Sequence, residues 1–296
     1  MFLGLVLGLC AAFFQSCSYL GSRWFVGRYP GGSVRLLALG HVWMGAVSIV
    51  LAAAFWPDTM PAFGTYAYSL LGTVGFYLLG QMCLFLALRH TDASRVSPLL
   101  GLKVLMLALM SAVFLDAHYS IQQWSAVGLS ILAAVMLALS GGTIARNSLL
   151  WAVAACLPYC LSDMNIKLLV GHFDAMGLLG SSVFATAITY LFCGLLGGAM
   201  LVFLPKADKR QWRDATPFAA AWLISMLFLY ACFGQIGVVF GNILQSTRGI
   251  QSILMGAIIA HWGMVTLERK IHRGALLERI AAAILMTAAI ALFYLG

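Results

Sequence analysis

Charged side chains are scarce in this sequence. Asp, Glu, Lys and Arg make up 9% of the 296 residues, whereas roughly a quarter of the residues in a soluble globular protein are charged. Hydrophobic residues make up 62% of the chain, and the mean hydropathy is +0.97. This composition excludes a soluble domain, because most of the chain must face lipid or other apolar helices.

Several motifs of energy coupling and catalysis are also absent. The sequence has no G-x-x-x-x-G-K-[ST] phosphate loop and no H-E-x-x-H metalloprotease motif. No apolar run carries a regular Arg ladder, which argues against a voltage sensor. We therefore expect no enzyme, no metal site and no cofactor. A passive channel stays a minor alternative, as does a membrane-embedded enzyme, for which His90-x-Asp92 and His172-x-Asp174 are the local candidates.

Ten apolar runs of about 20 residues, the length that crosses a bilayer, follow one another with short gaps. The sequence thus predicts an all-α integral membrane protein of ten transmembrane helices. The predicted spans are 2–20, 34–56, 67–88, 96–115, 121–140, 148–170, 177–204, 217–239, 242–263 and 276–295.

The basic residues are divided unequally between the gaps. Gaps one, three, five, seven and nine, taken with the first few residues of the spans that follow them, hold 14 of the 17 Lys and Arg residues. Cytoplasmic loops of membrane proteins are enriched in Lys and Arg, so we expect the odd gaps to be cytoplasmic and both termini to face outward. The net charge of +8 then reflects orientation and not nucleic-acid binding. We expect the protein to be located in a bacterial cytoplasmic (inner) membrane.

Two halves of the chain repeat one pattern. Gly80-Gln81 precedes Leu115-Asp116, and Gly234-Gln235 precedes Leu267-Glu268 at nearly the same spacing. A shift of about 150 residues also brings Cys10 onto Cys156. Five spans per unit would place the second copy upside down relative to the first, as in transporters with inverted repeats. We predict two repeats, 1–146 and 147–296.

The first half carries further sequence features at ordered positions. These are Ala87-Leu88-Arg89, Ser97-Pro98-Leu99, Phe114-Leu115-Asp116, Trp124 and Gly128. With Leu267-Glu268 and a closing span from Leu276, the chain resembles the drug/metabolite transporter superfamily, and specifically its ten-span EamA-type permeases. The resemblance implies a duplicated five-span unit and a transport function.

Ionisable groups within apolar spans are costly and are candidate site residues. Lys103 lies at the centre of the fourth predicted span, and Asp163 lies deep in the sixth. Lys103 is interpreted as a cavity cation that holds an anionic substrate group, or as a structural partner of a neighbouring acid. Asp163 is interpreted as a proton-coupling carboxylate or as the counter-charge of Lys103.

Amide and aromatic side chains complete the predicted substrate site. Gln81 and Gln235 occupy matching places in the third and eighth spans, where amides bind polar solutes or join helices. The aromatic residues deep enough to line a cavity include Tyr77, Tyr159 and Trp43.

The sequence predicts a secondary transporter, an exporter of small polar metabolites such as amino acids or related organic solutes. The alternative within transport is an exchanger of phosphorylated or nucleotide-linked solutes, which a second cavity cation would favour. The expected partners are the lipid bilayer, a small-molecule substrate and a coupling proton, with no nucleic acid. The expected assembly is a monomer or homodimer.

Overall fold

The structure is a computed structural model that describes residues 1–88, 99–114, 116–140, 146–251, 255 and 273–296. Some features of the sequence lie outside the described residues. These are Arg89, His90, Asp92, Arg95, Ser97, Pro98, Leu115, Leu267, Glu268, Arg269 and Lys270.

Every regular element in the described part of the chain is helical, which fits a chain whose backbone groups must be satisfied within each span. The first half contributes α1 (Phe2–Arg28), α2 (Ser33–Ala54), α3 (Phe63–Leu88), the 3-10 turn η1 (Leu100–Leu102), α5 (Lys103–Phe114) and α6 (Ile121–Leu139). The second half contributes α7 (Arg146–Gly171), η2 (Asp174–Met176), α8 (Gly177–Val202), α9 (Lys209–Ile236), α10 (Val238–Ser246) and α12 (Arg273–Leu295).

Seven helices among the described residues are long and apolar enough to cross a membrane, namely α1, α2, α3, α6, α7, α8 and α9. Two shorter apolar helices span Leu100–Phe114 and Ile280–Leu295. The all-helical membrane fold is therefore confirmed, and the count of ten spans stays a prediction.

One predicted boundary is wrong. The eighth span was expected to run from 217 to 239, but α9 ends at Ile236 and α10 begins at Val238. Gly237 lies between them with φ = 82°, a conformation that glycine adopts without steric cost. Hydropathy does not change across this glycine, so only its backbone geometry marks the helix end.

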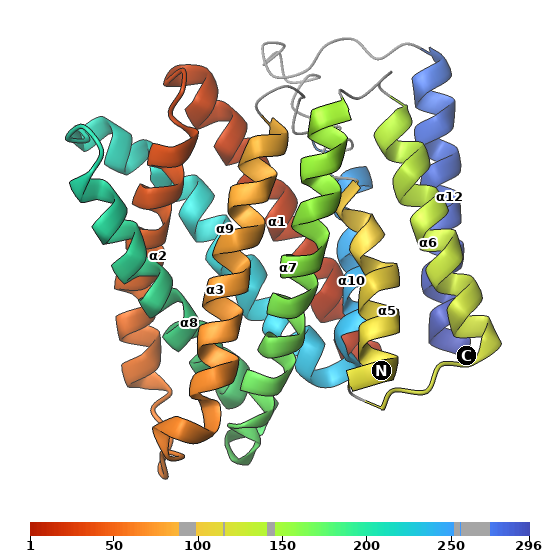
Figure 1. The fold of residues 1–296 in the computed structure, drawn as a ribbon, viewed down its shortest axis with the longest axis horizontal. Helices are drawn as coiled ribbons and strands as arrows, with labels where there is room; N and C mark the ends of the chain where they lie inside the picture. Colours follow the sequence, from red (N-terminus) through yellow and green to blue (C-terminus); the bar gives the residue numbers. More distant parts are fainter. Residues whose placement is uncertain (89–98, 115, 141–145, 252–254, 256–272) are drawn as a thin grey trace.

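The helices pack mainly as four pairs. These are α1 with α9, α3 with α7, α2 with α8 and α6 with α12, and each pair joins one helix of the first half to one of the second. The two halves are therefore interleaved through the bundle and do not form separate globular units (Figure 1).

Both termini lie at one end of the bundle, the lower end in Figure 1. The first residues of α2, α7 and α12 and the last residues of α1 lie at the opposite end. This opposite end carries Arg28, Arg35, Arg146 and Arg273. The described basic gap residues thus share one end of the molecule.

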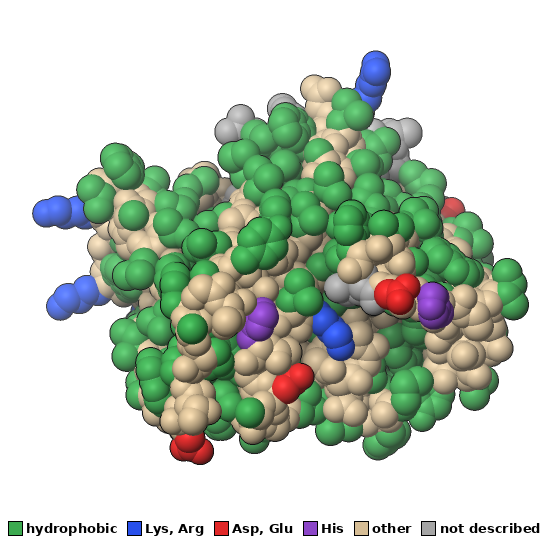
Figure 2. All heavy atoms as spheres, turned by 60° about the horizontal axis from the view of Figure 1, so that its bottom comes forward, with side chains coloured by type: hydrophobic (Ala, Val, Ile, Leu, Met, Phe, Trp, Pro, Cys, Tyr) green, Lys and Arg blue, Asp and Glu red, His purple; other side chains and the backbone are tan. Residues whose placement is uncertain are grey.

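The outer surface is strongly apolar. Figure 2, turned to bring the end with the termini forward, shows hydrophobic side chains over most of the visible surface and few charged ones. Exposed apolar residues on several helices include Leu71, Val113, Leu179 and Leu195, each more than half exposed. Such a surface is compatible with a surrounding lipid phase and not with water.

Candidate functional site

A cavity of ≈ 580 Å³, including the part open to solvent, lies in the interior of the bundle. Its lining comes from both halves of the chain. The lining residues are Gln15, Tyr19, Thr73, Tyr77, Leu100, Lys103, Tyr159, Ser162, Asp163, Ile166, Thr189, Tyr190, Trp222, Met226, Leu229, Tyr230, Gln245 and Arg248.

Lys103 and Asp163 form an ion pair across this cavity. Lys103 is the first residue of α5, directly after the 3-10 turn, and not the middle of a continuous helix. Its Nζ lies 3.0 Å from Oδ2 of Asp163 on α7. Both side chains are more than 90% buried. The pair therefore ties η1 and α5 of the first half to α7 of the second.

Two amide side chains on α10 form hydrogen bonds to the ion pair. Lys103 Nζ also donates to Oε1 of Gln245 at 3.3 Å, and Asn242 Nδ2 donates to Oδ2 of Asp163 at 2.9 Å. Tyr159 presents its ring to the ammonium, with Nζ 5.8 Å from the ring centroid. Because these neutral groups solvate both charges, the pair withstands burial that would otherwise cost several kcal/mol per ion.

A second cation lines the cavity. Arg248 lies two residues after the end of α10, and only 6% of its surface is exposed. Its Nη1 donates to Oε1 of Gln15 on α1 at 2.9 Å, and its Cζ lies 5.9 Å from the ring centroid of Tyr19. Both contacts hold the guanidinium without neutralising its charge.

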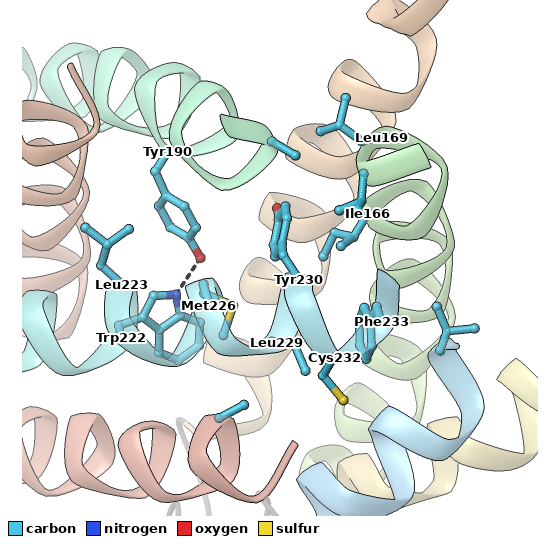
Figure 3. Close-up of a cluster of buried hydrophobic side chains, with 14 of the residues drawn as sticks. Ile166, Leu169, Tyr190, Trp222, Leu223, Met226, Leu229, Tyr230, Cys232 and Phe233 are labelled. Carbon is cyan, nitrogen blue, oxygen red and sulfur yellow. Dashed lines mark hydrogen bonds between the residues drawn. The ribbon is translucent and has the colours of Figure 1, made fainter. Parts of the chain in front are cut away.

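Aromatic residues from α8 and α9 form another wall. Figure 3 shows Tyr190 of α8 pointing toward Trp222 of α9, and Trp222 Nε1 donates to the Tyr190 hydroxyl at 2.7 Å. Met226 and Tyr230 follow on α9 at helical spacing and line the same cavity. This wall offers a solute apolar ring faces with a few polar edges.

Tyr77 lines the cavity, and a chain of hydrogen bonds connects its hydroxyl to residues behind the cavity surface. Gln81 Nε2 lies 3.0 Å from the Tyr77 hydroxyl, which lies 3.1 Å from Nε2 of His41. His41 Nδ1 lies 2.8 Å from the carbonyl oxygen of Leu37. A carbonyl only accepts, so Nδ1 carries a proton, and in the neutral ring Nε2 is then the acceptor for the Tyr77 hydroxyl. The chain fixes the orientation of Tyr77 in the cavity.

The predicted site residues fall into three groups in the structure. Lys103, Asp163, Tyr77 and Tyr159 line the cavity. Gln81 is buried and contacts the cavity through Tyr77.

Gln235 and Trp43 lie elsewhere. Gln235 is exposed near the end of α9. Trp43 is 37% exposed on α2, where its Nε1 donates to the carbonyl of Trp212 at 3.1 Å. Neither residue lines the cavity.

Sequence reasoning missed Arg248, Gln245 and Asn242 as site residues. They were assigned to a polar start of the ninth span and its preceding gap. The available signal was the cluster of polar residues in Gly241–Gln251, which is unusual in an apolar span. Their shared burial shows that this polar segment lies inside the bundle.

No group of three His, Cys, Asp or Glu side chains suited to a metal ion occurs among the described residues. Cys156 and Cys160 instead contact backbone carbonyls, with Cys160 Sγ 3.4 Å from the carbonyl oxygen of Lys103. The Cys160 contact joins α7 to the start of α5, whereas Cys156 contacts the carbonyl of Ala152 within α7.

The family comparison decides between the classes of protein. Residues 2–139 match the model of the EamA-like transporter family. The resemblance predicted from the sequence is confirmed over these residues, and the match indicates a membrane transporter of the drug/metabolite type. It points to a transporter and not to an enzyme.

At least one solved structure shares the fold over nearly the whole chain. In all, 29 chains match, and one of them, described only as "Crystal structure of protein", has a TM-score of 0.71. That match covers 99% of this chain and 98% of the other at 18% identity, so the similarity concerns the fold alone. No curated protein matches the chain.

Proposed function

We propose that this EamA-like chain is a secondary transporter that exports small polar metabolites across the cytoplasmic membrane by alternating access. The observation that carries the proposal is the buried Lys103–Asp163 pair within a cavity that is lined by residues of both halves. Buried charges in a membrane bundle are costly and mark substrate or ion pathways. Transporters of this general design bind solutes near the bilayer midplane, at the interface between repeats.

The helix pairing supports two inverted repeats, 1–146 and 147–296. If α1, α2, α3, α5 and α6 correspond in order to α7, α8, α9, α10 and α12, a two-fold rotation turns the α1–α9 pair into the α7–α3 pair. The same rotation maps the α2–α8 and α6–α12 pairs onto themselves. All four main pairings therefore obey one symmetry.

The crossing of α2 and α8 supports the symmetry at single residues. Gly45 and Gly194 meet back to back, and a Cβ built on either one would lie 2.7–2.8 Å from the Cα of the other. The Gly45 Cβ would also approach the carbonyl of Tyr190, and the Gly194 Cβ would approach the carbonyl of His41. Both relations correspond to a shift of 149 residues. Reciprocal contacts of this kind are the mark of a two-fold axis.

In the proposed mechanism, the contact between Lys103 and Asp163 breaks and re-forms during the transport cycle. Their ion pair, with Asn242 and Gln245, joins α5, α7 and α10 in the state described. A solute that competes for Lys103, or a proton that neutralises Asp163, weakens this link. The two halves are then free to rock relative to each other. A solute that binds one of the two states more tightly than the other shifts the equilibrium toward that state.

The direct test is transport by Lys103→Ala in proteoliposomes. We expect loss of counterflow of every solute that the wild type carries, with normal membrane insertion. The matched control is Lys167→Ala, which removes another intramembrane cation. Lys167 lies outside the cavity and donates to the carbonyls of Phe233 and Gly234. Full counterflow by Lys103→Ala would remove the proposed role of the ion pair.

We further propose that the end of the bundle with the basic residues is cytoplasmic. Lys206 lies in the gap after α8, and Trp56 in the gap after α2, at opposite ends of the bundle. A cysteine at position 206 should react with an impermeant maleimide only from the cytoplasmic side, and one at position 56 only from outside. The reverse labelling pattern would contradict this orientation. Transport by vesicles of both orientations tests the export direction.

Arg248 favours a second candidate function. An exchanger of phosphorylated or nucleotide-linked solutes needs more than one cavity cation, and both Lys103 and Arg248 line the cavity. The ion pair with Asp163 offsets one of these two charges. Counterflow driven by phosphate esters, and not by unphosphorylated metabolites, would select this alternative.

A further inference from the structure

The cavity carries one positive charge that the protein does not balance. Its charged lining residues are Lys103, Asp163 and Arg248. Lys103 and Asp163 neutralise each other at 3.0 Å. Among the residues that the structure describes, no carboxylate forms an ion pair with Arg248, whose described partners are Gln15 and Tyr19. The lining therefore has a net charge of about +1 in its ionised form.

The guanidinium of Arg248 is held in place by α1. Gln15 accepts from Nη1 at 2.9 Å, and Tyr19 packs its ring against the guanidinium. The backbone is held as well, because Ser16 Oγ donates to the carbonyl of Arg248 at 3.0 Å. An arginine has five N–H donors, and the Gln15 contact accounts for one of them. A positioned guanidinium of this kind matches a planar anion that accepts two parallel hydrogen bonds.

We propose that Arg248 binds the carboxylate of a singly charged organic anion and thereby sets the substrate class of the transporter. The inference rests on the proposed transport function and adds to it the chemistry of the solute. A buried charge is stable only when it is paired and hydrogen-bonded. A bound carboxylate supplies the missing negative charge and leaves the Lys103–Asp163 pair intact.

The amount of charge favours a carboxylate over a phosphate ester. A phosphate monoester carries about −1.5 to −2 at neutral pH, which exceeds the single unbalanced positive charge unless Asp163 releases Lys103. The rest of the lining suits an organic body, because the aromatic residues Tyr77, Tyr190, Trp222 and Tyr230 line the cavity. Thr73 adds a buried hydroxyl without a hydrogen-bond partner in the structure.

The test measures ligand binding by detergent-solubilised full-length protein and counterflow by the same protein in proteoliposomes. Thermal shift and quenching of the intrinsic tryptophan fluorescence report binding. The probes are benzoate and phenylpyruvate as monocarboxylates, phenyl phosphate as a phosphate ester, phenethylamine as a cation, phenylalanine as a zwitterion and glucose as a neutral solute. We expect the monocarboxylates to bind most tightly and to drive counterflow.

The decisive variant is Arg248→Gln. We expect it to raise the Kd for the monocarboxylates at least tenfold, and Arg248→Lys to give a smaller increase because it keeps the charge without the planar fork. Lys167→Gln is the matched control and should leave the Kd unchanged. If Arg248→Gln does not fold, Gln15→Leu serves in its place, because it removes the amide that positions the guanidinium and leaves the charge in the cavity.

The outcomes separate the two proposals. Counterflow of the amine, glucose or the zwitterion in preference to the monocarboxylates, unchanged in Arg248→Gln, would overturn the carboxylate site and keep the transporter. Tighter binding of phenyl phosphate than of benzoate would overturn the carboxylate class. Binding of monocarboxylates that depends on Arg248, without counterflow of any solute, would keep the site and overturn the proposed transport function.

Discussion

One pair of positions differs sharply between the two halves. In the first half's α5, Lys103 meets Asp163 of α7 as an ion pair of 3.0 Å. Under the proposed repeat, Lys103 corresponds to Met255 and Asp163 to Cys17. Those two residues also meet, with Cys17 Sγ 3.7 Å from Met255 Sδ. Under that repeat, the fold brings the same two positions together twice, once as a buried ion pair and once as a sulfur contact.

The contrast separates scaffold from chemistry. At the α2–α8 crossing the two halves are equal, because Gly45 and Gly194 allow the same close approach from both sides. At the Lys103 and Met255 positions they differ, and only the charged version lines the cavity. Packing is satisfied by the sulfur contact as well, so the ion pair is not required for the helices to meet. Burying the two charges of the ion pair costs free energy, and this cost indicates a functional role for the pair.

The largest effect is expected from breaking the ion pair on one side. Asp163→Ala leaves the Lys103 ammonium buried without its counter-charge. Removal of one partner of a buried pair costs about 3–5 kcal/mol, so we expect a lower melting temperature and no counterflow. Thermal unfolding in detergent and proteoliposome counterflow measure the two effects. Wild-type stability in this variant would show that another group neutralises Lys103.

Replacing both residues with their counterparts from the other half should separate stability from transport. The double variant Lys103→Met/Asp163→Cys recreates the contact between Met255 and Cys17. Replacement of a buried ion pair by apolar residues is often neutral or stabilising by about 1–4 kcal/mol. We therefore expect a melting temperature no lower than that of the wild type. A loss as large as in Asp163→Ala would mean that the pair holds the fold together.

A smaller effect is expected at the symmetric crossing. Gly45→Ala and Gly194→Ala each insert a methyl group against the opposite backbone, and overpacking costs about 1–3 kcal/mol. Because the contacts are reciprocal, the two variants should lose similar stability, measured by thermal unfolding. Gly198→Ala on the same helix as Gly194 is the control, because its Cβ meets nothing within 4 Å. Unequal losses at positions 45 and 194 would argue against a two-fold axis there.

The smallest effect separates the two matching glutamines. Gln81→Leu removes the amide beside the Tyr77 hydroxyl, and a lost hydrogen bond of this kind costs about 0.5–1.5 kcal/mol. We expect a modest rise in the KM of counterflow, since Tyr77 lines the cavity. Gln235→Leu should leave KM unchanged because Gln235 is exposed. Equal effects at both positions would place Gln235 in the transport path.

The sequence predicted the membrane class, the family resemblance and the approximate helix positions, because hydropathy and spacing are local properties. It also singled out Lys103 and Asp163, since a charge in an apolar run is conspicuous. It missed Arg248, because a basic residue near a span edge has the same pattern as a loop residue. The contact between Arg248 and Gln15 joins positions more than 230 residues apart, and only the folded bundle brings them together.

The outward position of Gln235 shows the opposite limit. Matching sequence places gave Gln81 and Gln235 equal weight, but a helix side chain moves by 100° with each residue. A shift of one or two residues in register therefore turns a side chain from the cavity toward the surface. Sequence spacing predicts the repeat, but it does not determine which face of each helix points toward the cavity.

The most direct test of the account is solute counterflow by the Lys103→Met/Asp163→Cys variant in proteoliposomes, with protein shown to be folded by its melting temperature. The account predicts no counterflow of any solute that the wild type carries, although the protein is as stable as the wild type. Counterflow at the wild-type rate would contradict it, because the charged version of the contact would then be dispensable for transport.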